Sequence, residues 1–163
     1  MKQGDLRAIA IVVLGLMALP GVGYAMSTNS SSSSSSGSST VQPDLYKQAQ
    51  DLVDQKQYAQ AIPLLQESIQ QKGEYADALN LLGYANRKLG NQSKAMTYYT
   101  KALNKEPNHL GANEYMGELY LEMNQLPKAQ ERLAVLKSAC GSCEAYEDLE
   151  GQINDYKKKH GLS

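Results

Sequence analysis

Apolar side chains recur at three- and four-residue spacing from about residue 44 onward, in stretches separated by short polar turns. This spacing places them along one face of an α-helix. The stretch 76–109 predicts two antiparallel helices, with a turn at Gly90-Asn91 and an end at Pro107. Shifted by 34 residues in either direction, it aligns with 42–75 and 110–143. We therefore predict an all-α fold of three helix-turn-helix repeats.

Small residues recur at two positions of every repeat. They are Ala49, Gly83 and Gly117 in the first helices and Ala61, Ala95 and Ala129 in the second helices. A larger side chain there would push the two helices of a hairpin apart, so we assign these positions to packing. The last stretch, 144–163, carries four apolar residues at helical spacing and predicts a helix that caps the stack. These residues are Tyr146, Leu149, Ile153 and Tyr156.

The 34-residue period and the placement of the small residues resemble the tetratricopeptide repeat, whose pattern is W-x2-L-G-x2-Y, then A-x3-F, then P. The repeat 76–109 matches it as Leu79-x2-Leu82-Gly83, Ala95-x3-Tyr99 and Pro107. The tryptophan of the pattern is absent, since Leu45, Leu79 and Asn113 stand there. The resemblance implies a right-handed solenoid of three repeats over 43–143, followed by the capping helix.

In this family the first helices of the repeats line a concave groove that holds a peptide or helix of a partner protein. The resemblance therefore implies a non-enzymatic adaptor or scaffold. Asn80 is expected to bond a peptide backbone, Arg87 to bind a carboxylate, and Tyr84 and Tyr115 to pack against side chains. The alternative is that these are ordinary solvated helix positions. The complete set of expected groove residues is Tyr46, Gln50, Asn80, Tyr84, Arg87, Glu114, Tyr115 and Glu118.

The first 25 residues do not follow the repeat pattern. A basic start at Lys2 and Arg7, an apolar run over 8–19 and small residues up to Ala25 indicate a signal peptide that is cleaved after Ala25. The apolar run is shorter than the ~20 residues that span a bilayer, which favours cleavage over a membrane anchor. The Ser-rich stretch 26–42 predicts a flexible linker. We therefore expect export to the bacterial periplasm, a partner in the cell envelope and no membrane insertion after cleavage.

The charge balance argues against a nucleic-acid partner. Removing residues 1–25 takes away two basic residues and one acidic residue, which leaves 14 Lys and Arg against 16 Asp and Glu, a net charge of −2. Nucleic-acid binding depends on clustered cations, and the one cluster, at 157–159, lies at the end of a predicted helix, where cations suit the helix dipole. Self-association through the ends of the repeat stack stays a further hypothesis.

Cys140 and Cys143 form a C-x-x-C motif between the third repeat and the predicted cap. A disulfide there would close a loop of about four residues and stabilise the fold by about 2 kcal/mol. The alternatives are a thiol-disulfide redox function, a zinc site, and a free or intermolecular pair of thiols. Thioredoxins place this motif after a strand, and no strand pattern exists here. Zinc requires four ligands, and His109 and His160 are the only histidines. We expect no metal, no cofactor and no enzyme activity, since no Ser-His-Asp pattern or phosphate loop is present.

Overall fold

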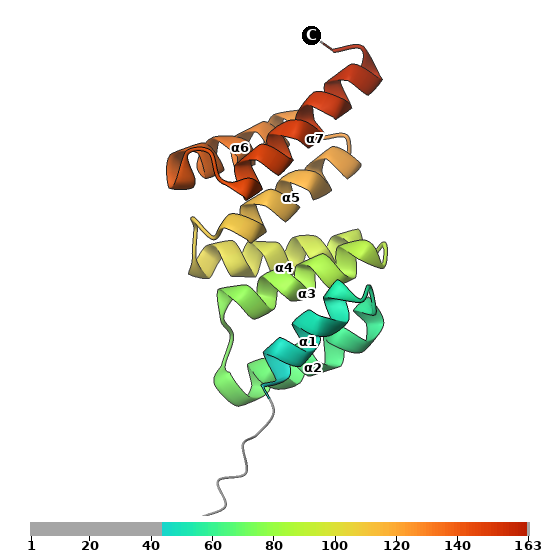
Figure 1. Ribbon diagram of the computed structural model, residues 1–163, viewed down its shortest axis with the longest axis vertical. Helices are drawn as coiled ribbons and strands as arrows, with labels where there is room; N and C mark the ends of the chain where they lie inside the picture. The colour runs from blue at the N-terminus through green and yellow to red at the C-terminus, as the bar shows by residue number, and fades with distance from the viewer. Residues whose placement is uncertain (1–43, 163) are drawn as a thin grey trace, which may run out of the picture. The chain divides into compact units, whose positions relative to one another are not determined.

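The computed structural model describes residues 44–162, which form seven α-helices and no strand within that range. The helices pair into three hairpins, α1–α2, α3–α4 and α5–α6, and α7 follows the last hairpin (Figure 1). This arrangement confirms the predicted all-α repeat solenoid. The predicted signal peptide, 1–25, and linker, 26–42, lie outside the described residues. The helices are α1 (Leu45–Asp54), α2 (Tyr58–Lys72), α3 (Ala76–Lys88), α4 (Gln92–Lys105), α5 (Leu110–Glu122), α6 (Leu126–Cys140) and α7 (Glu144–His160).

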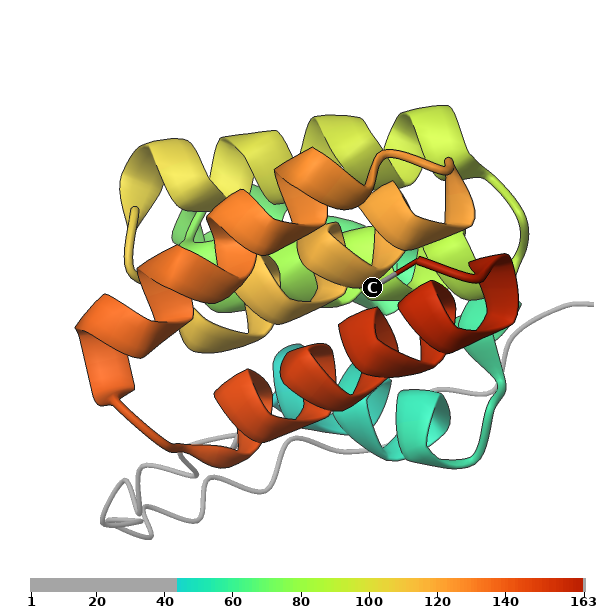
Figure 2. The ribbon, with the colours of Figure 1, turned by 90° about the horizontal axis from the view of Figure 1, so that it is seen from above.

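The helices of the domain form two layers. Each first helix contacts the next one, α1 with α3, α3 with α5, and α5 with α7. The second helices α2, α4 and α6 contact first helices but not each other. Figure 2 looks down the stack and shows the yellow-green α4 and the red α7 on opposite sides. Since neighbouring first helices approach more closely than neighbouring second helices, the first-helix layer is the inner, concave one.

The turn inside each hairpin repeats with the 34-residue period. Lys56, Gly90 and Asn124 adopt positive φ angles of 60°, 79° and 57°. The residue after each of them donates its backbone N–H to a carbonyl five residues earlier, as in a Schellman motif. These bonds are Gln57 to Leu52 at 2.7 Å, Asn91 to Asn86 at 2.9 Å and Gln125 to Tyr120 at 2.7 Å. The same C-terminal cap therefore ends α1, α3 and α5.

The small residues of the first helices make close contacts, as predicted, but not all within one hairpin. A Cβ atom on Gly83 would lie 2.5 Å from Cε1 of Tyr99 on α4, the partner helix. A Cβ on Gly117 would lie 2.5 Å from Cδ2 of Leu149 on α7, and its three nearest atoms all belong to that leucine. The predicted contact of Gly117 with its own hairpin partner is therefore corrected to a contact with the capping helix.

The missing tryptophan of the third repeat is replaced by a polar residue whose hydrogen bonds are made. Asn113 is fully buried. Its side-chain nitrogen donates to the carbonyl of Pro107 at 2.9 Å and to that of His109 at 3.0 Å, and its oxygen accepts from Nη1 of Arg132 at 3.2 Å. A buried amide with its partners in place avoids a large desolvation cost. Asn113 thereby ties the end of the second repeat to the third.

None of the helices within 44–162 has the length and apolar character required to cross a membrane.

Candidate functional site

All eight expected groove residues lie on the first-helix layer, whose surface, formed by α1, α3, α5 and α7, we call the inner face. They occupy repeated helix positions. Tyr46, Asn80 and Glu114 are 34 residues apart, and so are Gln50, Tyr84 and Glu118. The inner face is hollowed at two places, and four of the eight expected residues line these hollows: Gln50, Tyr84, Glu114 and Tyr115.

The first hollow lies between α1, the start of α2, α3 and α5, and has a volume of about 310 Å³. Three half-buried tyrosines dominate it. The rings of Tyr84 and Tyr115 lie 4.7 Å apart, those of Tyr58 and Tyr84 lie 6.0 Å apart, and the Lys88 ammonium lies 5.2 Å from the Tyr84 ring centre. Burial raises the pKa of Tyr115 to about 12, so its hydroxyl keeps its proton. We call this the tyrosine hollow; its lining is Gln50, Val53, Asp54, Lys56, Tyr58, Leu81, Tyr84 and Tyr115.

A buried ion pair joins α3 to α5 beside this hollow. Arg87 is 6% exposed and pairs with Glu118, and its Nη1 donates to Oε1 of Glu122 at 2.8 Å. Burial opposes the charge on Arg87, but Glu118 above all, with Tyr99 and Glu122, raises the pKa of Arg87. The expected role of Arg87 as a binder of a partner's carboxylate is therefore revised, because its guanidinium is engaged by carboxylates of this chain.

The second hollow lies between α5 and α7 and has a volume of about 430 Å³. Glu114 stands in it, and burial above all raises the pKa of Glu114 to about 8, with Glu118, Asp148 and Glu144 adding to the rise and Arg87 opposing it. Tyr115 lines both hollows, so they are neighbours on the inner face. We call this the acidic hollow; its lining is Leu110, Glu114, Tyr115, Cys143, Glu144, Ala145 and Asp148.

Tyr46 and Asn80 line neither of these hollows. The Tyr46 ring packs edge-on against Tyr75, with 5.9 Å between ring centres. The Asn80 side chain lies against Gly111, and its buried amide oxygen has no hydrogen-bond partner among the described residues. The oxygen is buried, so the expected bond from Asn80 to a partner's backbone stays a prediction.

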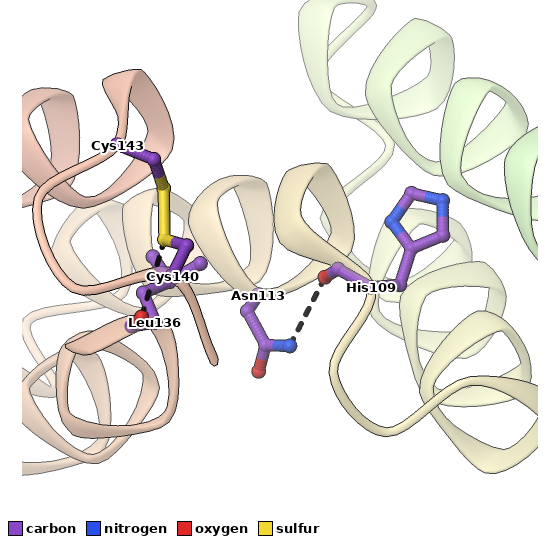
Figure 3. The surroundings of a disulfide bond; sticks show 5 residues. All are labelled: His109, Asn113, Leu136, Cys140 and Cys143. Atoms are coloured by element: carbon purple, nitrogen blue, oxygen red, sulfur yellow. Dashed lines mark hydrogen bonds between the residues drawn. A yellow bond between two sulfur atoms is a disulfide. The ribbon is translucent and has the colours of Figure 1, made fainter. Parts of the chain in front are cut away.

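Cys140 and Cys143 are joined by a disulfide at the turn between α6 and α7 (Figure 3). Cys140 Sγ lies 3.2 Å from the carbonyl oxygen of Leu136, and Cys143 is the N-cap residue of α7. The bond therefore fixes the start of α7, whose first turns carry Glu144 and Asp148 to the acidic hollow. Within 44–162 no cluster of three or more His, Cys, Asp or Glu could hold a metal ion.

A third hollow, of about 460 Å³, lies along the second helices. Its lining comes mostly from α2 and α4, and includes Ile62, Thr97 and Lys101. No expected groove residue lines it. We call it the outer hollow, and we call the surface of the second-helix layer the outer face.

The structure adds residues that were not expected at the site, chiefly Tyr58, Glu144 and Asp148. One sequence signal could have found two of them. Asp148 is 34 residues after Glu114, and Glu144 is 34 residues after Leu110, so α7 continues the series of first helices. The helix α7 is thus more than the predicted cap, because it supplies one wall of the acidic hollow.

Two tetratricopeptide repeat family profiles match this sequence, one over residues 46–109 and the other over residues 86–153. Together they cover the three hairpins and most of α7. The chain belongs to the tetratricopeptide repeat family. Its fold is a stack of helical hairpins, as in that family. This membership supports a role as a protein-interaction module. No curated protein sequence matches this chain.

Solved structures show the same fold at low sequence identity. The type III secretion translocator chaperone SycD of Yersinia enterocolitica superposes with a TM-score of 0.63 at 16% identity, over 72% of this chain and 84% of SycD. The tetratricopeptide repeat domain of Arabidopsis OM64 gives 0.62 at 15% identity, over 69% and 93%. PcrH, solved with the chaperone-binding region of PopD, gives 0.59 at 16% identity, over 71% and 86%. At these identities the likeness shows the fold.

Proposed function

We propose that this tetratricopeptide repeat protein is a non-enzymatic adaptor of the cell envelope, which holds a peptide or helix of a partner protein against its inner face. The observation that carries the proposal is the tyrosine hollow. Three tyrosines from three helices, α2, α3 and α5, converge on one open hollow and are only half buried. Aromatic rings with polar tips are the side chains that contribute most at protein interfaces.

Two further observations support this proposal. The inner face extends without a gap from α1 to α7, so it offers an elongated surface suited to a chain segment rather than to a compact small molecule. Of the structures that share the fold, PcrH is solved with a region of PopD and SycD with a peptide of YopD. Those partners belong to those proteins, and the partner here is named only by its chemistry.

The test compares two tyrosine substitutions made in the full chain, purified from its source cells with bound proteins quantified by mass spectrometry. Tyr84→Ala opens the tyrosine hollow. Tyr120→Ala is the matched control, since Tyr120 is also half buried on a first helix but packs against Lys128 of α6. We expect at least one bound protein to be lost from Tyr84→Ala and kept by Tyr120→Ala, with helicity unchanged in both. Equal recovery by the two folded variants refutes a role for the tyrosine hollow.

The setting in the envelope is supported by the N-terminal sequence and by the disulfide, because disulfides persist in oxidising compartments. Mass spectrometry of the protein from its source cells is expected to find a mature chain that begins at Met26, after cleavage behind Ala25. An intact N-terminus at Met1 would contradict export by this route.

A thiol-disulfide exchange function is the second candidate. It is favoured by the position of Cys143 at the N-terminus of α7, where the helix dipole stabilises a thiolate. The direct measurement is reduction of insulin by the reduced protein. Turnover that is abolished by Cys143→Ser would establish this function, and absence of turnover would reject it.

A further inference from the structure

We propose that the acidic hollow takes a lysine or arginine side chain of the partner segment, while the adjoining tyrosine hollow takes an apolar or aromatic side chain of the same segment. This inference rests on the proposed function and states the kind of segment that the inner face selects.

Glu114 is the first feature of the hollow that favours a cation. This residue is nine-tenths buried, with 9% exposure, and lines the hollow. Among residues 44–162 its carboxylate has no hydrogen bond or ion pair. By contrast, Glu118, one turn later on α5, accepts from Gln152 and pairs with Arg87. Burial disfavours the charged form of Glu114, and a cation that enters the hollow would stabilise that form.

The charge around the hollow also favours a cation. From α7, Glu144 and Asp148 face Glu114, and from its own helix Glu118 does so. The basic group that acts on Glu114 is Arg87 of α3, and Arg87 is already paired with Glu118 and Glu122. The described residues therefore surround the hollow with more negative than positive charge. Charge complementarity of this kind selects a cationic side chain and rejects an anionic one.

The two hollows share Tyr115 as a common wall. The Tyr115 ring stands 4.7 Å from Tyr84 on one side and lines the acidic hollow on the other. One partner segment that crosses Tyr115 can therefore fill both hollows with side chains a few residues apart. The alkyl stem of a lysine or arginine can pack along Tyr115 and Ala145 while its charged head reaches Glu114.

Because Glu114 is buried, binding of a cation beside it is expected to change its protonation. Burial raises the pKa of Glu114 to about 8, so this group is largely protonated at neutral pH in the free protein. A bound cation favours the carboxylate form and lowers that pKa. Binding then releases a proton near pH 7, and the affinity must rise between about pH 6 and pH 8.

The experiment uses the full chain and a displayed library of random peptides, followed by synthetic fluorescent copies of the enriched sequences that lack histidine. We expect enriched peptides to carry lysine or arginine at a fixed distance from an apolar or aromatic residue. Replacing that lysine by norleucine, or Glu114→Gln in the protein, is expected to weaken binding about tenfold, because hydrogen bonds to charged groups are the stronger ones. Glu114→Gln should also abolish the rise of affinity with pH.

The matched controls are two identical substitutions in the first turn of α7. Glu144→Gln removes a charge from the lining of the hollow, and Glu147→Gln removes the same charge from the same helix turn outside it. We expect Glu144→Gln to weaken binding several-fold and Glu147→Gln to leave it unchanged. Equal effects of the two substitutions would overturn the inference.

The remaining outcomes separate this inference from the proposed function. Enriched peptides that lose binding in Tyr84→Ala but show no preference for a basic residue refute the cationic side chain and keep the inner face as the binding surface. Peptides that bind Tyr84→Ala as well as the wild type, or a library with no enrichment, refute both. Dimers of the chain that dissociate in Glu114→Gln would make a second copy the occupant and overturn the inference.

Discussion

Replacing Gly83 with alanine is expected to destabilise the domain, although alanine is the better helix former. The added Cβ would lie 2.5 Å from Cε1 and 2.6 Å from Cδ1 of Tyr99, and that ring has 0% exposure. The ring cannot move without displacing the core around it. Overpacking of this kind costs up to about 3 kcal/mol, and the helix preference of alanine over glycine returns about 1 kcal/mol. We expect a net loss of about 2 kcal/mol.

Gly151 provides the matched control, since it is also inside a helix, α7, but a Cβ there would meet no atom within 4 Å. Gly151→Ala should therefore raise the free energy of unfolding by about 1 kcal/mol, which is the helix preference alone. The two identical substitutions are expected to differ by about 3 kcal/mol, the sum of these two changes.

Urea unfolding followed by circular dichroism measures both values, provided that the dependence on urea is unchanged between variants. A further test is Gly83→Ala in a Tyr99→Leu background, where the ring that meets the Cβ is gone. There the alanine should stabilise, because only its helix preference remains. A Gly83→Ala protein as stable as the wild type, or a destabilisation that persists with Tyr99→Leu, would refute the packing argument.

Three smaller perturbations test other parts of the structure. Lys56→Gly should raise the free energy of unfolding by roughly 0.5–1 kcal/mol in urea, because relief of the left-handed conformation outweighs the entropy of glycine; Gly90→Ala, at the equivalent turn, should lower it by about 1 kcal/mol. Replacing Cys140 and Cys143 with serine should lower the free energy of unfolding by about 2 kcal/mol and make it insensitive to dithiothreitol, with unchanged helicity. The pKa of Glu114 is raised from 4.5 to about 8 in the folded protein. Protonated Glu114 therefore adds to the free energy of unfolding below about pH 4.5, and this stabilisation is lost as the pH rises through 8. The urea midpoint of Glu114→Gln should lack this fall.

The repeat architecture could be predicted from the sequence because its signals are local. Helical periodicity and turn residues each act within one hairpin, and the period repeats them three times. The turns at Lys56, Gly90 and Asn124 adopt the same backbone conformation although only one of them is glycine. The 34-residue period, rather than the residue type, is what the three turns share.

The environment of the groove residues could not be predicted in the same way. Arg87 on a polar helix face looked exposed, and its burial depends on Glu118 and Glu122, which lie in the next repeat, 31 and 35 residues away. Such contacts depend on how two hairpins stack, which no local pattern states. The same holds for Gly117, whose close neighbour Leu149 belongs to the helix that follows its hairpin. Asp148 follows Glu114 at the 34-residue spacing, so its place beside Glu114 could have been predicted. That prediction requires α7 to be counted as the first helix of a fourth repeat.

We expect the inner face, and not the outer face, to contact the partner. The most direct measurement places a photo-crosslinking amino acid at Gln50, in the lining of the tyrosine hollow, or at Thr97, in the lining of the outer hollow, in the full chain in its source cells. We expect a partner to be crosslinked from Gln50 and not from Thr97, and the product to diminish with Tyr84→Ala. Crosslinking from Thr97 alone, or equally from both positions, would contradict the account.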